Sequence, residues 1–242
     1  MFQLFKKELY HYFTSYMAYI SASAFVLICT LFLWFFDNEF NIFNIGTATL
    51  NSFFFIAPWI LLFLIPALTM RTLAEEESSG TLYWLFTQPI KIYGIVWGKF
   101  LPILVVLLFC ILPTLLFIYT LNQFIISEQT LDYGTFFSGY LGLFLVGSSF
   151  ASVGIFTSSL TKNQVAAYVL AVFLNFVLFY AFESLASYNL LGTADYYVQK
   201  FGMLVHFQQL LKGILDTRDL IYFIAIITLF LVLTNYNLER KK

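Results

Sequence analysis

Residues 100–122 read FLPILVVLLFCILPTLLFIYTLN, a run that contains no charged side chain. A helix rises about 1.5 Å per residue, so a run of this length crosses the roughly 30 Å hydrocarbon core of a membrane. The whole chain of 242 residues is 61% hydrophobic and only 10% charged. Soluble domains carry about 25% charged residues, so this chain has too little polar surface to cover a water-exposed fold. The sequence therefore predicts an integral membrane protein.

Five further charge-free stretches are long enough to cross a membrane. We expect an all-α fold with six transmembrane helices, at residues 17–36, 52–70, 100–122, 136–159, 165–182 and 220–236. The runs are continuous, whereas strands of a membrane β-barrel are about ten residues long and alternate in polarity. The first run is too long for the apolar part of a signal peptide, so we expect it to remain as an anchor. Residues 1–242 are predicted to form one transmembrane domain.

The positions of Lys and Arg predict the orientation, because cytoplasmic loops retain positive charge. Four segments that we assign to the cytoplasm carry Lys6, Lys7, Arg71, Lys91, Lys99, Lys162, Arg240, Lys241 and Lys242. The loops at residues 37–51 and 128–132 carry acidic residues and no Lys or Arg, as external loops should. The loop at 183–219 is the exception, because it carries three Lys or Arg residues together with four acidic ones. We therefore predict both termini in the cytoplasm. The formal net charge of -1 leaves no basic excess for a nucleic-acid partner.

Residues 1–16 have the pattern of an amphipathic helix that lies on the membrane before the first span. Aromatic and aliphatic residues recur at steps of three and four, and Gln3, Lys7 and His11 fall on the opposite face. One interpretation is a simple membrane anchor. The alternative is a lever that contacts a cytoplasmic partner, with Lys6, Lys7 and Glu8 as its charged candidates.

Residues 71–99 form the most informative segment outside the spans. The second helix is expected to continue past Glu75 and Glu76 and to break at Gly80, because glycine readily adopts the conformations that end helices. Thr81 can cap a new short helix, and Pro89 limits its length. The apolar surface of that helix comes from Leu82, Trp84, Leu85 and Phe86. The segment is either an ordinary interfacial loop or a transverse helix that a cytoplasmic protein grips.

Two other features concern packing. The segment 183–219 contains an apolar group that is too short and too interrupted by charge to span, so it either dips into the outer leaflet and returns or forms a surface amphipathic helix. The fourth span is rich in small residues, which permit close helix contact in a membrane. The candidates for this packing are Gly142, Gly147, Ser148 and Gly154.

The residues of an enzyme are missing from the sequence. His11 and His206 are the only histidines, and no metal-binding motif and no phosphate-binding loop with the required Gly-Lys-Ser/Thr spacing exists. The centres of the spans also hold no acid or base that could relay protons or coordinate ions. We predict no catalytic residue, no metal site and no cofactor bound by this chain. Any energy must come from a partner.

The sequence RTLAEEESSGTLYWLFTQPI at residues 71–90, followed by Gly98-Lys99, resembles the signature of type-2 ABC exporter permeases. Within that family the chain looks most like the gliding-motility-associated ABC transporter permease of Bacteroidetes. Further similarity lies in FNI at residues 40–42, APWILLFLIP at 57–66 and NQVA at 163–166, so the resemblance covers nearly the whole chain. Tyr83 and Glu77 depart from the residue types usual at their places.

The resemblance implies six spans, an N-terminal interfacial helix, a cytoplasmic coupling helix and short re-entrant helices in the last external loop. It also implies a bacterial inner-membrane exporter in which an ABC ATP-binding subunit holds ATP and Mg²⁺. Other implied partners are a second permease subunit, the lipid bilayer and an accessory motility protein. The residues expected to shape the contact with the ATPase are Glu75, Glu76, Gly80, Thr81, Leu82, Leu85 and Pro89. The alternative is a non-transporting membrane scaffold that transmits ATPase motion.

Overall fold

The computed structural model describes residues 2–45, 49–124, 133–188, 192 and 195–242. This part of the chain is helical and contains no strand. Six of its helices are long and apolar enough to cross a membrane, as predicted. They comprise Met17–Phe35, Asn51–Ser78, Ile92–Gln123, Tyr133–Leu160, Gln164–Ser187 and Thr217–Lys241. The predicted external loop at 128–132 lies outside the described residues.

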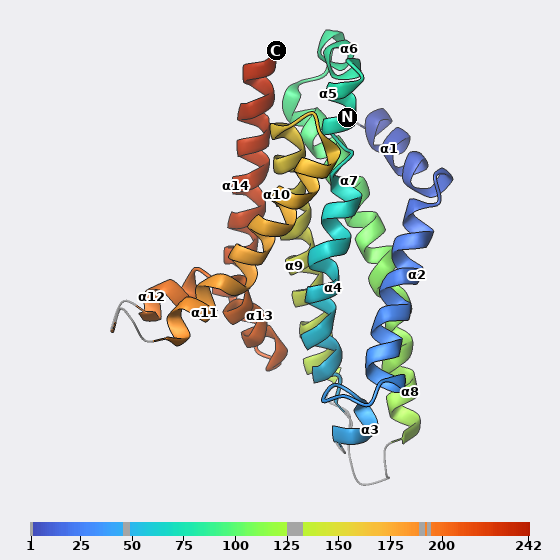
Figure 1. Ribbon diagram of the computed structural model, residues 1–242, viewed down its shortest axis with the longest axis vertical. Helices are drawn as coiled ribbons and strands as arrows, with labels where there is room; N and C mark the ends of the chain where they lie inside the picture. Colours follow the sequence, from blue (N-terminus) through green and yellow to red (C-terminus); the bar gives the residue numbers. More distant parts are fainter. Residues whose placement is uncertain (1, 46–48, 125–132, 189–191, 193–194) are drawn as a thin grey trace.

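Several of these long helices are built from consecutive pieces (Figure 1). The first joins α2 (Met17–Thr30) to the π-helical turn η1 (Leu31–Phe35), and the second joins α4 (Asn51–Thr69) to α5 (Ala74–Ser78). The third joins α7 (Ile92–Ile111), the 3₁₀ turn η2 (Leu112–Leu115) and α8 (Leu116–Phe124). The fifth joins α10 (Gln164–Phe176), the π-helical turn η3 (Val177–Ala181) and α11 (Phe182–Ser187).

The helices extend beyond the predicted spans. The third begins at Ile92 rather than at Phe100, so much of the predicted loop 71–99 is helical. A lysine marked the predicted boundary, but Lys99 lies inside α7 because neighbouring carboxylates compensate its charge. A charged residue near the end of an apolar run therefore does not mark the end of the helix.

Helix α9 (Tyr133–Leu160) is the centre of the bundle and contacts α4, α7, α10, α13 and α14. Its small residues make this possible. A Cβ at Gly154 would lie 2.1 Å from Thr69 Oγ1 on α4, and one at Gly147 would lie 2.7 Å from Leu107 on α7. A Cβ at Gly142 would meet Phe207 and Leu210 at 3.1–3.2 Å. The hydroxyl of Ser148 donates to the carbonyl of Phe144 in its own helix.

Short helices lie between the fifth and sixth long helices, as expected. They are α12 (Asp195–Lys200) and α13 (Met203–Leu211), followed by α14 (Thr217–Lys241). Helices α11 and α12 project sideways from the bundle, and α13 returns to it (Figure 1). Met203, Phe207 and Leu210 of α13 are buried. The depth of these helices in a membrane stays a prediction.

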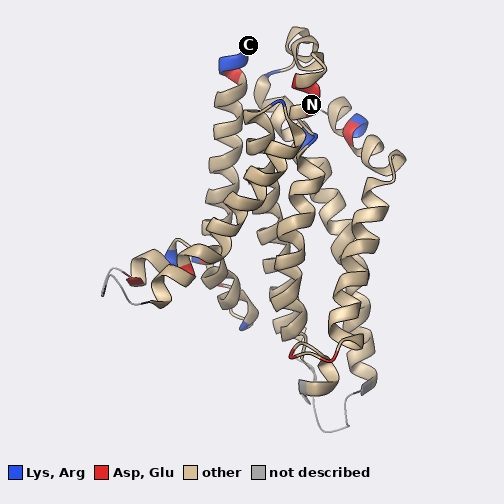
Figure 2. Ribbon diagram, in the orientation of Figure 1, with Lys and Arg blue, Asp and Glu red and all other residues tan. Residues whose placement is uncertain are grey.

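Both chain termini lie at one end of the bundle, together with α1 (Phe2–Thr14), α5 and α6 (Thr81–Thr87) (Figure 1). The short helix α3 (Ile42–Ile45) lies at the opposite end. Lys and Arg gather mainly at the end with the termini and beside α12, whereas the turn before α3 carries only acidic charge (Figure 2). We call the end with α1, α5 and α6 the charged end.

Candidate functional site

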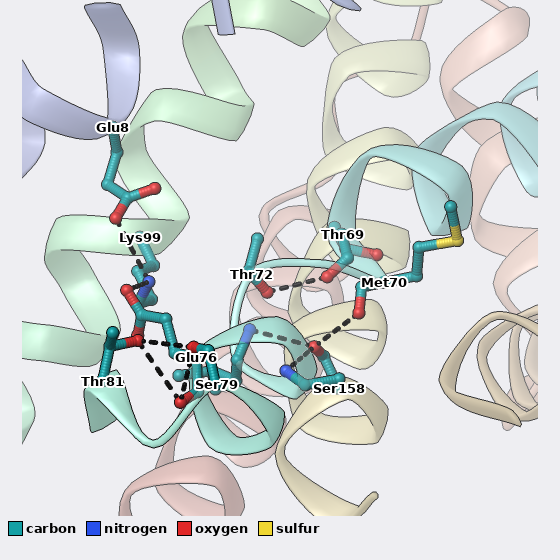
Figure 3. A network of polar contacts seen from close by, with 11 residues as sticks. Glu8, Thr69, Met70, Thr72, Glu76, Ser79, Thr81, Lys99 and Ser158 are labelled. Atoms are coloured by element: carbon teal, nitrogen blue, oxygen red, sulfur yellow. Dashed lines mark hydrogen bonds and ion pairs between the residues drawn. The ribbon is translucent and has the colours of Figure 1, made fainter. Parts of the chain in front are cut away.

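The junction between α4 and α5 is held by a serine of the central helix. Ser158 Oγ accepts hydrogen bonds from the amides of Leu73 and Ala74, at 3.1 and 3.0 Å, and donates to the carbonyl of Met70 (Figure 3). The first amides of a helix have no partner within it, and here a buried hydroxyl of α9 satisfies them. The start of α5 is therefore fixed to the core of the bundle.

The turn between α5 and α6 depends on Gly80. Its φ of 74° lies in the left-handed region, where side chains with a Cβ are strained. Thr81 Oγ1 donates to the carbonyl of Glu76 at 3.3 Å and lies 2.9 Å from Ser79 Oγ (Figure 3). The sequence correctly predicted a helix break at this glycine and a new helix from Thr81, but the predicted cap by Thr81 is wrong: Gly80 is the N-cap residue, and no side chain makes a cap hydrogen bond.

Helix α6 has one face against the chain and one face open. Leu82 and Leu85 are buried, and Leu85 packs against Leu4 of α1 and Ile95 of α7. Tyr83 and Trp84 are 56% and 64% exposed. We predicted Leu82 and Leu85 for the interface with the ATPase; both pack beneath the exposed face of α6, and their part in that interface stays a prediction. A helix this short, apolar on both faces, has no pattern that tells which face is buried.

A buried lysine joins three helices at the charged end. Lys99 Nζ of α7 lies 2.7 Å from Glu76 Oε1 of α5 and 3.2 Å from Glu8 Oε1 of α1, and its side chain is 1% exposed (Figure 3). Gly98 lets α1 approach, because a Cβ there would lie 2.9 Å from Leu4. We call Glu8, Glu76 and Lys99 the ion triad. Sequence reasoning used Lys99 as a marker of orientation and as part of the family signature, and it missed this role.

Side chains at the end of α14 bind both α5 and α9. Lys241 Nζ pairs with Glu77 of α5 and also donates to the carbonyl of Ser159 at 2.7 Å. Asn237 Nδ2 donates to the same carbonyl, also at 2.7 Å. The last carbonyls of a helix lack partners within it, so these side chains cap α9 while they fix α5.

Helix α1 is also tied to the second long helix. Tyr12 Oη donates to the carbonyl of Leu68 at 3.0 Å in a buried contact. Burial raises the pKa of Tyr12 above its ordinary value, and the nearby carboxylate of Glu8 raises it further. The phenol therefore stays a hydrogen-bond donor at neutral pH.

The remaining candidates lie on the surface around these contacts. Glu75 and Pro89 are exposed, as are Lys6 and Lys7 on α1. Helix α6 ends at Thr87, and Gln88 before the proline is extended, with ψ at 150°. A cavity of about 510 Å³ lies between α1 and α5–α6. Its lining includes Lys7, Arg71, Glu76, Trp84 and Lys99.

The contacts above give one mechanical unit. We call residues 74–87, which form α5 and α6, the coupling segment. It is fastened to α1 and α7 by the ion triad, to α9 by Ser158, and to α14 by Lys241. A displacement of the coupling segment must therefore move these four helices or break buried polar contacts.

Within the described residues, no three His, Cys, Asp or Glu side chains are grouped so that they could hold a metal ion. The model of a protein family described as "ABC-2 family transporter protein" matches residues 36–236. No curated protein matches the chain. The match covers most of the chain, all of the coupling segment and all or most of five of the six long helices, whereas the first, Met17–Phe35, lies before it. With its helical bundle and its coupling segment at one end, the chain belongs to the ABC-2 family of transporter proteins and is a multi-pass membrane permease of that family.

Proposed function

We propose that the chain is the permease subunit of an ABC exporter driven by a separate ATPase subunit, which holds the ATP and Mg²⁺. The observation that carries the proposal is the coupling segment. It presents Tyr83 and Trp84 at the charged end, while its other face is fixed to four helices. Exposed aromatic side chains at the centre of a patch are typical anchors of protein interfaces.

The proposed mechanism is a rigid-body movement. Closure of two ATPase subunits around ATP pushes on the coupling segments of two permease subunits, and each permease rocks to open an outward path. The ion triad and Ser158 make the push effective, because buried contacts resist local bending. A surface loop without such ties would absorb the displacement instead.

The proposal requires the charged end to face the cytoplasm of a bacterium. The supporting observation is the distribution of charge: the turn before α3 at the opposite end carries Asp37 and Glu39 and no Lys or Arg. A reporter protein that folds only in the cytoplasm, fused after Lys242, tests this orientation. Activity of the reporter agrees with it, and an inactive reporter on a fully expressed fusion contradicts it.

The link to gliding motility rests on the sequence resemblance alone. We propose that the exporter supplies or energises a motility apparatus through an accessory protein. Deletion of the chain in its own host should abolish spreading on a surface without slowing growth in liquid. Normal spreading of the deletion strain would remove motility from the proposal and leave the exporter function untouched.

The exposed aromatic pair gives a direct test of ATPase coupling. The double variant Tyr83→Ala with Trp84→Ala should fold normally but lose the ATPase subunit, because neither side chain is buried. Tyr119→Ala is the matched control, since Tyr119 is 65% exposed on α8, away from the charged end. If the double variant still binds the ATPase subunit and still stimulates its ATP hydrolysis fully, Tyr83 and Trp84 do not form the contact with the ATPase.

The rival function is a membrane scaffold that uses ATPase motion without transport. The purified complex of permease and ATPase in liposomes distinguishes the two. Movement of material from host-envelope extracts across the bilayer, dependent on ATP, supports the exporter. ATP hydrolysis that responds to the permease but moves nothing supports the scaffold.

A further inference from the structure

A histidine and an aspartate join the outer helices to the last long helix, far from the coupling segment. His206 of α13 has Nδ1 2.6 Å from Asp219 Oδ1 in the first turn of α14. Its Nε2 lies 2.9 Å from the carbonyl oxygen of Lys200, the last residue of α12. The side chains of His206 and Asp219 are only 16% and 8% exposed. One imidazole therefore ties the end of α12 to the start of α14.

The donors and acceptors of these two contacts do not balance when a neutral imidazole lies beside an ionised carboxylate. A carbonyl oxygen only accepts hydrogen bonds, and so does an ionised carboxylate. A neutral imidazole carries a single N–H and can satisfy only one of them. Both contacts form together when the ring carries two N–H groups, that is, as an imidazolium. The negative charge of Asp219 is favoured at its place, because the first turn of a helix stabilises anions.

An aromatic neighbour reinforces the same contact. The ring of Tyr222 stacks on His206 with 3.9 Å between centroids and 22° between planes, and its hydroxyl donates to the carbonyl of Phe201. An aromatic face attracts a cation, which again favours the protonated ring. Two consecutive carbonyls at the end of α12, those of Lys200 and Phe201, are thus capped by side chains from α13 and α14.

The other ionisable groups on the packed elements do not replace this partner. Helix α9 carries no charged residue, and Arg218 of α14 is exposed. The ammonium of Lys200 lies over the ring of Tyr196, 4.3 Å from its centroid. Glu183 of α11 accepts a hydrogen bond from Gln208. The other ionisable groups on these elements are Tyr133 and Tyr140 of α9, Tyr180 of η3, Asp195 and Tyr197 of α12, and Tyr236, Glu239, Arg240 and Lys241 of α14.

We propose that the doubly protonated ring of His206 fastens residues 195–211 to α14, because one ring N–H binds Asp219 and the other binds the carbonyl of Lys200. Loss of one of these protons breaks a contact and releases the segment. The segment is thus held while the ring carries both protons, and it is loosened when the pH is raised far enough to remove one of them. The device requires no ATPase and stands apart from the proposed function. In the proposed orientation this contact faces the outside of the cell.

Hydrogen exchange of the purified full chain at pH 5.5 and 8.5, corrected for the intrinsic effect of pH on exchange, tests the proposal. Protection of the amides at 196–211 should fall about tenfold or more at the higher pH, because the segment loses a hydrogen bond to a charged group. Peptides from α9 should not change. His206→Gln should abolish the pH dependence, and His11→Gln, which removes the other of the two histidines, should leave it intact. Equal protection of the wild-type segment at both pH values would overturn the proposal.

A second measurement does not depend on the folding of the His206 variant. In the His11→Gln chain labelled with ¹⁵N-histidine, every ring signal arises from His206. At pH 5.5 both ring nitrogens should have the shifts of protonated N–H groups, and the signals should move together as the pH rises. An unprotonated ring nitrogen at pH 5.5 would contradict the proposed imidazolium.

Discussion

Removal of the charge at the centre of the ion triad should destabilise the charged end. Lys99→Met keeps the length of the side chain but leaves Glu8 and Glu76 without their shared partner. Breaking a fully buried pair in this way costs about 3–5 kcal/mol. The two carboxylates here are 13% and 19% exposed, so water screens part of the effect, and we expect about 2–3 kcal/mol.

The assay is the unfolding midpoint of the purified chain in a mild detergent, followed for each variant under the same conditions. Lys91→Met is the matched control, because Lys91 is exposed at the start of the same helix and should change the stability by less than about 0.5 kcal/mol. The triple variant Glu8→Gln, Glu76→Gln, Lys99→Met should recover most of the loss, because no uncompensated charge remains.

The outcome separates a buried charge network from an ordinary surface contact. A Lys99→Met chain as stable as the Lys91→Met control would refute the reasoning, since it would mean that water already solvates the triad. A triple variant no more stable than Lys99→Met alone would show that the loss came from packing and not from charge.

Three further changes test the packing around the coupling segment by the same unfolding assay. Ser158→Ala should cost about 3 kcal/mol, because two buried amides lose their acceptor; an unchanged midpoint would show that water replaces the hydroxyl. Gly154→Ala should cost about 1–3 kcal/mol, since its Cβ collides with Thr69. Gly142→Ala should cost less, because its neighbours are flexible side chains, and the reverse order would contradict the described packing. Gly80→Ala should cost about 1 kcal/mol from backbone strain alone, since no atom lies within 4 Å of its Cβ, and Gly80→Asn should cost less; equal stability of all three chains would argue against the left-handed turn.

The long helices could be predicted because their signal is local. Each is a run of apolar residues, and the charge-free windows located all six, although α7 begins at Ile92 and α14 continues to Lys241. The break at Gly80 was also predictable, since the conformational freedom of glycine is a property of a single position.

The contacts that define the candidate site could not be predicted, because they join residues far apart in the chain. Glu8 and Lys99 are separated by 91 positions and Glu77 and Lys241 by 164, and no periodicity links such pairs. Glu77 departs from the residue type that is usual at this place in the family signature, and it is the partner of Lys241. Tyr83 lies on the open face of α6, while the predicted Leu82 and Leu85 lie beneath it, since only tertiary packing decides which face is covered.

The central claim is that the coupling segment binds an ATPase. Its most direct test is affinity purification of the tagged full chain in mild detergent, with identification of the co-purifying proteins and an assay of ATP hydrolysis. We predict that the wild type and the Tyr119→Ala control bring down a P-loop ATPase and that the Tyr83→Ala, Trp84→Ala variant does not. Recovery of envelope proteins alone, with no ATPase on the wild-type chain, would contradict the account and favour the scaffold.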